Sequence, residues 1–344
     1  MKRFLPLTAL LLLSAILSYT QTSKGSHTFM IMSYNTENFY DTINDPHTAD
    51  DEFTPKGRKH WNTAHYQQKL AGIARVISSI REKGFPDVVV LCEVENRAVL
   101  EDLLRQPSIT GAKYRIIHKD SRDTRGIDIA MLYRQDQFRV LSWRLIDFGY
   151  PGEKVERTRG ILYVTGIAGK GDTLHILGNH WKSRVGNQAE TEAKRIFEAG
   201  FLKTKTDSIL KRNRNARIIC LGDLNDEPTS NSINQVLDAR CPANSKNRPA
   251  LVNIMCPLHL KGEGTYSYKN RWLMLDNIIV SKSLLSNRAR FHLAGTEGHV
   301  YKAPWLLQYN AKAGEQVPYK TYAGDKYLGG YSDHLPVYAI FTYR

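Results

Sequence analysis

Short segments rich in apolar residues recur along the whole chain and are bounded by polar residues, glycine or proline. Such segments are typical of β-strands that are buried on both faces. They predict strands at residues 28–34, 88–91, 114–118, 127–133, 138–143, 161–167, 174–177, 218–221 and 275–280. Beyond His334 the apolar residues recur at every second position, which predicts one last buried strand containing Leu335, Val337, Ala339 and Phe341.

Longer segments place their apolar residues at helical spacing instead. Residues 62–83 carry them on one face, and Gly84 and Pro86 end the pattern. Residues 190–211 predict a second long helix, with many Lys and Arg residues on its exposed side, and residues 98–104 predict a short one. Strands and helices thus alternate along the chain, which predicts a mixed α/β layering within one domain.

Polar side chains lie at the ends of five predicted strands. They fall in Asn35-Thr36-Glu37, Cys92-Glu93, Asn179-His180, Asp223-Leu224-Asn225 and Ser332-Asp333-His334. A polar group at the end of a buried strand is where α/β proteins place their chemistry. One Asp-His pair alone has little specificity, but five such segments together predict a single site where the strand ends meet.

These five segments resemble, in order and in residue type, the motifs of the endonuclease/exonuclease/phosphatase family of metal-dependent phosphodiesterases. The resemblance covers residues 29–344. It implies a deoxyribonuclease-like α/β fold of two stacked mixed β-sheets flanked by helices, that is, a four-layer sandwich. We expect residues 21–344 to form this single domain.

The resemblance also implies a site for a divalent cation. Its metal-binding glutamate matches Glu93, with Asn35 beside it and Asp333 completing the ligands. A hard cation held by a few oxygen ligands neutralises the charge of a phosphate, and Mg²⁺ is expected, or Mn²⁺, with Ca²⁺ as a further candidate. The family varies at the position of Glu37, so metal binding and a structural role both remain open there.

His334 is the expected general base or phosphate-binding group, because an ordinary histidine titrates near neutral pH. By resemblance its carboxylate partner is Asp276. That aspartate lies among apolar residues, where an unpaired carboxylate is costly. Asp223 and Asn225 match a Gly-Asp-x-Asn motif, in which the aspartate activates water or protonates the leaving oxygen and the asparagine orients the phosphate. The same segment also has the composition of a turn, and both roles can hold together.

A second histidine, His180, resembles one found in the deoxyribonuclease branch of the family. We expect Asp128 to be its carboxylate partner, with a surface charge as the alternative for Asp128. Asn179, Arg125 and Lys182 are the expected substrate-binding residues, and Arg184 is a further candidate for phosphate contact.

The charge of the chain narrows the choice of substrate. The 344 residues carry a net charge of +14. The segment 1–20 has a basic start and a short apolar core, which predicts a signal peptide and a secreted or periplasmic protein. Removing Lys2 and Arg3 with it leaves 14 − 2 = +12. A basic protein of this kind suits a polyanion such as nucleic acid, although the charge could serve solubility alone.

Other features bear on the surroundings of the site. No membrane span and no protein partner are indicated, and we expect a monomer. Cys92 and Cys220 lie in apolar runs and are expected to be buried thiols, whereas Cys241 and Cys256 could pair in an oxidising compartment. The tyrosine-rich segment 301–331 leads directly into Ser332. Its rings could stack on bases or could fix a loop by burial, and the sequence does not separate the two.

The sequence therefore predicts a secreted, metal-dependent phosphodiesterase, in the first place a nuclease that uses direct water attack. The alternative is a phosphatase or phospholipase-type hydrolase of inositol phosphates, sugar phosphates or sphingomyelin, because the family hosts both on one fold. A non-catalytic binding module is disfavoured, because all the residues that the motifs require are present.

Overall fold

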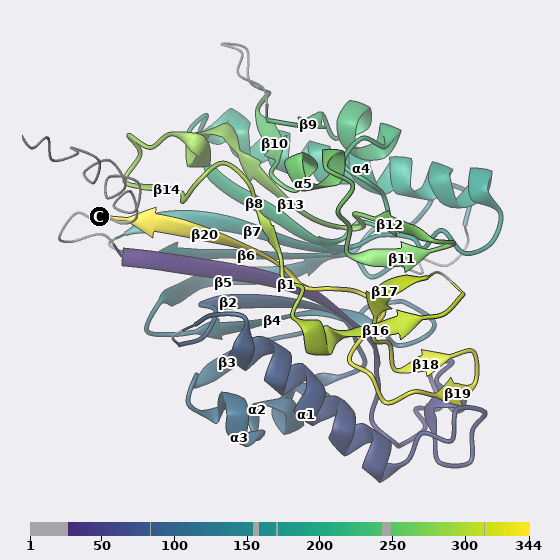
Figure 1. Cartoon of the computed structure of the whole chain (residues 1–344). Helices are drawn as coiled ribbons and strands as arrows, with labels where there is room; N and C mark the ends of the chain where they lie inside the picture. Colours follow the sequence, from purple (N-terminus) through teal and green to yellow (C-terminus); the bar gives the residue numbers. More distant parts are fainter. Residues whose placement is uncertain (1–26, 83, 154–157, 170, 243–248, 313) are drawn as a thin grey trace, which may run out of the picture.

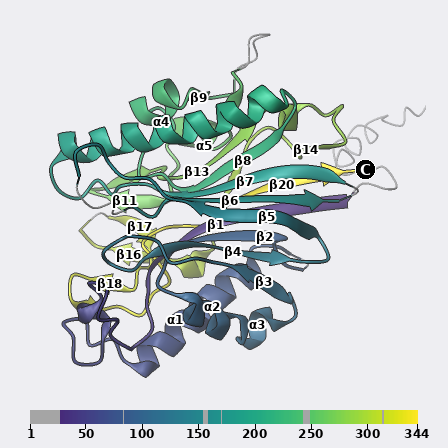
Figure 2. The same cartoon turned by 180° about the vertical axis from the view of Figure 1, so that it is seen from behind.

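Two seven-stranded β-sheets are stacked face to face, and helices cover their outer faces (Figures 1 and 2). The computed structural model describes residues 27–82, 84–153, 158–169, 171–242, 249–312 and 314–344. The predicted signal peptide, residues 1–20, lies outside them. The predicted four-layer α/β sandwich is confirmed.

The first sheet has the strand order β14-β20-β1-β2-β4-β3, and β15 also pairs with β20. Its parallel pair, β1 and β2, is in register from Ile31 opposite Val88, with an irregularity after Asn35. The strands are β1 (His27–Phe39), β2 (Val88–Val94), β3 (Tyr114–Ile117), β4 (Asp128–Arg134), β14 (Phe291–Leu293), β15 (His299–Val300) and β20 (Val337–Tyr343).

The second sheet has the strand order β5-β6-β7-β8-β13-β10-β9. β7 and β8 are parallel, and β13 runs antiparallel to β8 with Asp276 opposite Asp223. The strands are β5 (Phe138–Ile146), β6 (Ile161–Ala168), β7 (Asp172–His180), β8 (Arg217–Asp223), β9 (Ala239–Arg240), β10 (Leu251–Asn253) and β13 (Asp276–Ser281). In each sheet the two parallel strands end at the same edge, which brings their C-terminal residues together.

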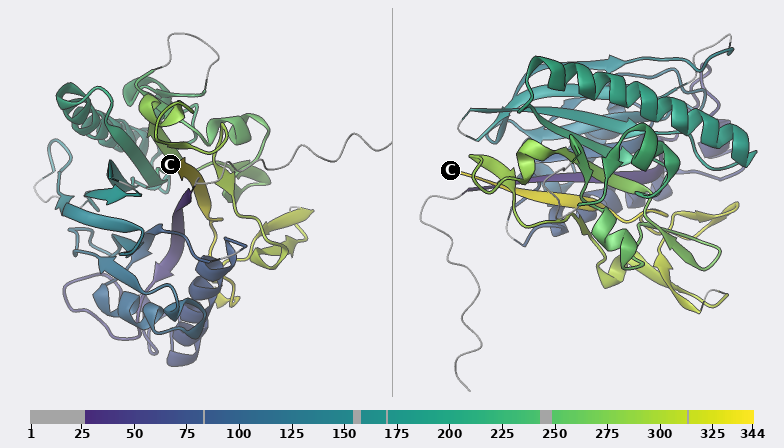
Figure 3. Two further views of the ribbon diagram at one scale, coloured as in Figure 1. Left: turned by 90° about the vertical axis from the view of Figure 1, so that its left-hand side faces the viewer. Right: turned by 90° about the horizontal axis from the view of Figure 1, so that it is seen from above.

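Three hydrophobic clusters hold the layers. One fills the space between the sheets, one lies under the α1 side and one lies under α4. α4 runs across the outer face of the second sheet (Figure 3, right). The helices are α1 (Thr63–Ser79), α2 (Arg97–Leu104), α3 (Pro107–Thr110), α4 (Gln188–Arg212) and α5 (Cys256–Leu260), with helical turns at Asp51–Phe53, Ser232–Val236, Lys282–Leu285 and Pro304–Leu306. Within the described ranges, no helix is long and apolar enough to cross a membrane.

Three small hairpins border the end of the sandwich at which the parallel strands finish (Figure 1, right-hand side). They are β11 (Tyr266–Tyr268) with β12 (Arg271–Leu273), β16 (Leu307–Asn310) with β17 (Glu315–Pro318), and β18 (Tyr322–Ala323) with β19 (Lys326–Tyr327). The sequence pattern did not predict these hairpins, because strands of two to four residues give no periodic signal.

The rings of the tyrosine-rich segment mostly fix the loop. Tyr322 is only 8% exposed and packs against Phe53 and Trp61, while Tyr331 contacts the Trp305 ring. Tyr309 differs, since 65% of it is exposed. Burial therefore explains Tyr322, and contacts between rings hold Trp305 and Tyr331, which remain partly exposed.

The cysteines behave as expected. Cys241 and Cys256 form a disulfide, and Cys92 and Cys220 are buried free thiols. The pairing predicted from their positions is confirmed.

Candidate active site

Six strand ends and their adjoining loops bring the predicted residues to one edge of the sandwich. β1 supplies Asn35, β2 supplies Glu93, β7 supplies His180, β8 supplies Asp223, β13 supplies Asp276 and the loop before β20 supplies Asp333 and His334. Hydrogen bonds and short charge contacts connect these residues across the two sheets. The site expected from the sequence therefore exists as a cluster.

Asp276 and His334 form the predicted buried pair. The Asp276 Oδ2 lies 2.7 Å from His334 Nδ1, and the aspartate is fully buried. The other ring nitrogen, Nε2, is 3.8 Å from Asp223 Oδ2 and so faces the centre of the site. Burial opposes the ring charge, but the carboxylates of Asp276 and Asp223 outweigh burial and raise the pKa of His334 well above its usual value.

Asp223 and Asn225 form a turn and a polar centre at once. The backbone N–H of Asn225 donates to Asp223 Oδ1 at 2.8 Å, and Asn225 has a positive φ of 50°. The Asp223 Oδ2 accepts from the Asn35 amide at 3.0 Å. Burial raises the pKa of Asp223 to about 6, although the charge on His334 pulls it down. Both roles expected for this segment are geometrically compatible.

Asn35 orients the carboxylates around it. Its Nδ2 donates to Asp223 and, at 3.2 Å, to Glu93, while its Oδ1 accepts from the backbone of Glu37. The predicted oxygen ligand thus presents an NH₂ group to the carboxylates, because its oxygen is already bonded. Asn35 orients Glu93 here, and its oxygen keeps one lone pair, so its role as a metal ligand stays a prediction.

Glu93 and Asp333 add two carboxylates to the cluster, and their assignment to the cation stays a prediction. Within the described residues, the groups of three possible ligands that lie within 4.8 Å of one another are Asp223, Asp276 and His334, and His118, Asp120 and Asp128. Glu93 keeps 15% of its side chain exposed and has a positive φ of 64°, a strained conformation that is frequent at functional sites. No donor among the described residues hydrogen-bonds to the Asp333 carboxylate. Burial raises the pKa of Asp333, the charge on His334 lowers it, and the charge on Glu93 raises it further. Two carboxylates that repel one another without a bridging proton donor are the oxygen ligands that Mg²⁺, Mn²⁺ or Ca²⁺ takes.

Glu37 has a structural role in this arrangement. Its carboxylate accepts from the backbone N–H of Thr321 at 2.6 Å and of Tyr322 at 3.3 Å. It therefore fixes the tyrosine-rich segment beside Asp333. Burial, followed by the charge on Asp333, raises the pKa of Glu37 to about 7.

His180 also lies in the cluster, 3.7 Å from Asp223 Oδ2 and 3.8 Å from Glu93 Oε1 through its Nε2. Burial, aided by the positive charges of Arg159 and Arg125, lowers the pKa of His180 well below its usual value. The two histidines consequently favour opposite protonation states on either side of Asp223. Pairs of groups whose pKa values are pushed apart are typical of acid–base sites.

Asp128 is not the partner of His180, and this expectation is wrong. Its Oδ2 lies 2.9 Å from His118 Nε2, and its Oδ1 accepts from the backbone of Ser121. β3 and β4 are neighbouring antiparallel strands, so His118 and Asp128 meet across the base of their own loop. Asp128 therefore stabilises that loop.

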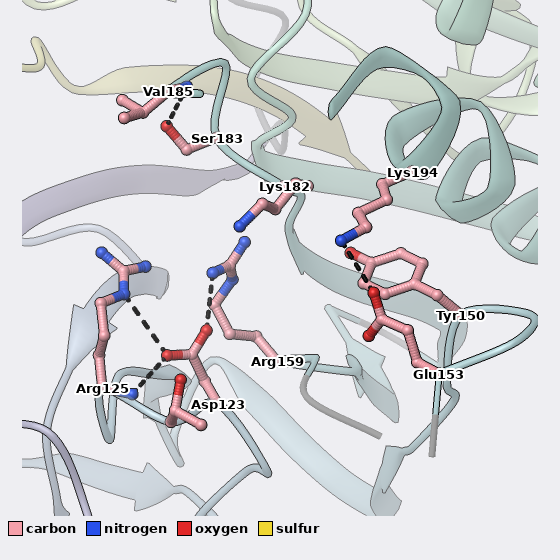
Figure 4. Close-up of a pocket in the computed structure, with 10 residues that line it drawn as sticks. Asp123, Arg125, Tyr150, Glu153, Arg159, Lys182, Ser183, Val185 and Lys194 are labelled. Carbon is pink, nitrogen blue, oxygen red and sulfur yellow. Dashed lines mark hydrogen bonds and ion pairs between the residues drawn. The ribbon is translucent and has the colours of Figure 1, made fainter. Parts of the chain in front are cut away.

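Asn179 cannot contact a substrate either. Its side chain is fully buried, donating to the Leu177 carbonyl and accepting from Trp181 Nε1. Arg184 is likewise engaged, with Asn225 and Asp226. Arg125 and Lys182, in contrast, line a cavity beside the site (Figure 4).

The sequence analysis overlooked two cations. Lys69 of α1 is 2% exposed and donates from Nζ to Thr321 and to the Tyr331 carbonyl. A signal was present, because Lys69 falls on the apolar face of the predicted helix. Arg159 is 5% exposed and binds the carbonyls of His180 and Trp181. It precedes a strand within a polar segment, so nothing in the sequence distinguishes it from a solvated arginine.

A two-sheet α/β sandwich with carboxylates, an amide and two histidines gathered at one edge defines a class of hydrolase. The chain belongs to the endonuclease/exonuclease/phosphatase family, whose model matches residues 30–343. Members of this family generally depend on divalent metal ions. Comparison with curated protein sequences gives no match.

Solved structures of this fold carry different activities in their names. A family member from Bacteroides thetaiotaomicron shares 17% identity and a TM-score of 0.55, covering 93% of this chain and 96% of its own. TDP2 from D. rerio, in complex with a single-strand DNA product, shares 16% identity and a TM-score of 0.55, covering 91% and 98%. A mannosyl-6-phosphatase from B. thetaiotaomicron shares 17% identity and a TM-score of 0.50, covering 90% and 98%. At these identities the likeness shows the fold alone.

Proposed function

We propose that this hydrolase is an exported, divalent-metal-dependent phosphodiesterase that cleaves nucleic acid by direct attack of water. The observation that carries the proposal is the convergence of Glu93, Asp223, Asp276 and Asp333 with two histidines of opposite protonation preference. Cys92 is a buried thiol that donates to the Asn179 carbonyl, and the Ser332 hydroxyl donates to the Asn35 carbonyl, so neither group is presented as a nucleophile. Export fits the predicted signal peptide and the Cys241–Cys256 disulfide.

Glu93 and Asp333 hold the cation in this proposal, and Asn35 fixes the orientation of Glu93. When bound, a divalent ion neutralises the charge that develops on the phosphate oxygens. The buried Lys69 lies near the same carboxylates and limits their mutual repulsion. Mg²⁺ is the expected ion, and Mn²⁺ and Ca²⁺ satisfy the same oxygen ligands.

Asp223 accepts the proton of the attacking water. A buried carboxyl with a pKa of about 6 is partly ionised near neutrality and holds a proton more readily than an ordinary aspartate. Asn225 is held beside it, donating from Nδ2 to the Trp181 carbonyl at 3.0 Å. His180, neutral in its buried position, completes this side of the site.

His334 presents a cationic ring to the phosphate from the other side. Asp276 fixes the ring by its bond to Nδ1, so Nε2 carries a proton that can be donated to a phosphate or leaving-group oxygen. Ser332 reinforces the loop, because its hydroxyl donates to the Asn35 carbonyl and accepts from the His334 N–H. In this proposal, the Asp276–His334 pair and the turn formed by Asp223 and Asn225 contact the same phosphate from two sides.

Nucleic acid is the preferred substrate class because the chain is strongly basic and because a cation-rich cavity adjoins the site. The same fold binds a single-strand DNA product in TDP2. The second candidate is a sugar-phosphate phosphatase, since a mannosyl-6-phosphatase has the same fold. Fold likeness cannot choose between these candidates.

The test is hydrolysis of plasmid DNA, RNA and mannose 6-phosphate by the purified protein, each with Mg²⁺ and with excess EDTA. We expect cleavage of nucleic acid that requires the metal and that declines steeply between low and moderate salt, as counterion release demands. Rapid release of phosphate from mannose 6-phosphate while plasmid remains intact would establish the second candidate instead.

A further inference from the structure

A cavity of about 710 Å³ opens beside the end of β7 (Figure 4). Its volume is in the range of small-molecule sites. The chain passes directly from His180 into this cavity, because Lys182 and Ser183 line it. The described lining residues are Asp123, Thr124, Arg125, Tyr150, Glu153, Arg159, Lys182, Ser183, Val185 and Lys194.

The inner wall of the cavity is rigidly built around Arg159. Its guanidinium donates to the carbonyls of His180 and Trp181 and, at 2.9 Å, to Asp123 Oδ2. One buried side chain thus ties the loop before β4 to the end of β7. On the opposite side, Glu198 of α4 accepts from the Tyr150 hydroxyl and from the backbone N–H of Lys182. Buried hydrogen bonds therefore fix the Arg159 wall of the cavity and the side that faces α4.

Positive charge dominates the lining. Four cationic side chains (Arg125, Arg159, Lys182 and Lys194) face two acidic ones, so the described lining carries 4 − 2 = +2. Both acids are already paired: Asp123 binds Arg159 and Arg125, and Glu153 binds Lys194 at 2.8 Å. Lys194 also binds Glu190 at 3.0 Å, so the positive surplus lies on the side of Arg125, Arg159 and Lys182.

Lys182 carries most of this excess. No carboxylate of the described chain lies within ion-pair distance of its ammonium, and Figure 4 shows the ammonium directed towards the Arg159 guanidinium. Burial, followed by the charges of Arg159 and Lys194, lowers the pKa of Lys182. Asp123 is the one lining carboxylate on this side and is shared with Arg125 and Arg159, so an anion that binds among these cations would relieve their mutual repulsion.

We propose that this cavity is a second phosphate subsite, which binds another phosphoryl group of the substrate while the scissile phosphate lies at Asp223 and His334. The inference rests on the proposed function and narrows its substrate class to phosphodiesters that carry a neighbouring phosphate. A phosphate monoester has a charge of about −1.5 to −2 at neutral pH, which matches the surplus in the lining. The cavity adjoins the reaction site because Arg159, which lines it, donates to the carbonyl of His180, whose ring lies 3.7 Å from Asp223 Oδ2.

The experiment compares matched diesters with and without that second phosphate. The probes are the p-nitrophenyl ester of thymidine 5′-phosphate with and without a 3′-phosphate, and the p-nitrophenyl ester of thymidine 3′-phosphate with and without a 5′-phosphate. In at least one of the two series, the added phosphate should raise kcat/KM of the wild type by on the order of ten-fold to a hundred-fold. This gain corresponds to the free energy of one charge-assisted hydrogen bond. Lys182→Gln should reduce that gain to about three-fold or less.

Lys211→Gln is the matched control. It makes the same change in the last turn of α4, 17 residues from Lys194, which corresponds to about 25 Å along the helix. It should retain the full gain. The subsite would be refuted if the wild type cleaved the esters with and without the second phosphate equally in both series. It would also be refuted if Lys182→Gln kept the full increase in kcat/KM that the second phosphate gives.

A binding measurement separates this proposal from the proposed function. Isothermal titration of inorganic phosphate into the protein in EDTA should show binding that Lys182→Gln weakens by about five-fold or more and that Lys211→Gln leaves unchanged. If no ester and no plasmid is cleaved but this pattern holds, the proposed function fails and the phosphate subsite stands. Absence of phosphate binding, or equal binding by the three proteins, would refute the subsite even if nucleic acid is cleaved.

Discussion

Two buried Asp–His pairs occur among the described residues, one through Nδ1 of His334 and one through Nε2 of His118, and their second ring nitrogens face different surroundings. His334 and Asp276 are 2.7 Å apart, and His118 and Asp128 are 2.9 Å apart. The free nitrogen of His334 faces the buried Asp223, whereas that of His118 lies 3.8 Å from Asp120, whose side chain is 84% exposed. A buried Asp–His pair therefore indicates catalysis only where the second ring nitrogen meets other functional groups.

The surroundings of the two pairs explain the difference. His334 follows Asp333 in the loop before β20, and its Nε2 lies 3.8 Å from Asp223 at the end of β8. Asp276 lies opposite Asp223 on β13, so segments from both sheets surround the ring. His118 and Asp128 belong to adjacent strands and close a single loop, where Asp128 also accepts from Ser121. The first pair connects distant segments at the site, and the second stabilises a local turn.

Removal of the metal should produce the largest loss of activity, because the site around Asp276 and His334 depends on it. The His118–Asp128 pair should be unaffected. Excess EDTA should abolish hydrolysis, and Glu93→Gln should lower kcat/KM on plasmid DNA by on the order of 10³-fold, because charge neutralisation of the phosphate is a dominant catalytic contribution. Glu101→Gln, on the exposed surface of α2, is the matched control and should retain the wild-type rate. Full activity in EDTA would refute the metal site.

Substitution of the two histidines should separate the pairs. His334→Ala should lower kcat/KM by about 10²- to 10⁴-fold, the usual contribution of an acid–base group. His118→Ala should remain within about three-fold of the wild type, because its ring does not face the reacting groups. Comparable losses in both variants, measured at equal folded fraction, would show that the His118 pair also takes part in the reaction.

The second pair should matter for stability instead. His118→Ala leaves one oxygen of the buried Asp128 without its partner, so the free energy of unfolding should fall by about 1–3 kcal/mol. His47→Ala removes an exposed ring and should be neutral within about 0.5 kcal/mol. Urea denaturation measures both, and an unchanged midpoint for His118→Ala would contradict the assigned structural role.

The smallest effect expected concerns pH. The pKa of His334 is raised in the folded protein, so its protonation stabilises the fold fully below the unfolded value of about 6.5. This stabilisation is lost as the pH rises through the folded pKa. In EDTA, the wild type should therefore lose stability relative to the neutral double variant Asp276→Asn/His334→Gln as the pH rises from 6 to 9. A constant difference between the two proteins would exclude a protonated His334.

Much of this site was predictable from sequence because each residue follows a buried strand. The apolar runs before Glu93 and Asp223 indicate where β2 and β8 end. Because β2 is parallel to β1 and β8 is parallel to β7, the C-terminal ends of each pair lie at the same edge of their sheet. Asp276 required a partner because it lies among apolar residues. The segments that became hairpins at the rim stayed unassigned, since their strands are too short for a periodic pattern.

The wrong partner for Asp128 has a physical explanation. His118 ends one predicted strand and His180 follows another, and residue types alone do not show which one Asp128 meets. The register of the β3–β4 pair decides it, because Ile117 lies opposite Met131 and places His118 beside Asp128. Local hairpin pairing took precedence over the remote contact that the resemblance implied. Asn179 failed for a related reason: its buried amide is bonded to the backbone of its own strand.

The central claim is that Asp276 and His334 act as one unit on the phosphate. The most direct measurement is a double-mutant cycle of Asp276→Asn and His334→Ala in kcat/KM for plasmid DNA, with Asp128→Asn and His118→Ala as the matched cycle on the other pair. We expect the double variant of the first cycle to be within about three-fold of His334→Ala alone, because residues that act together are not additive. In the second cycle, Asp128→Asn, His118→Ala and their double variant should all keep kcat/KM close to that of the wild type. If the losses of Asp276→Asn and His334→Ala instead multiply, the two residues act independently and the claim is wrong.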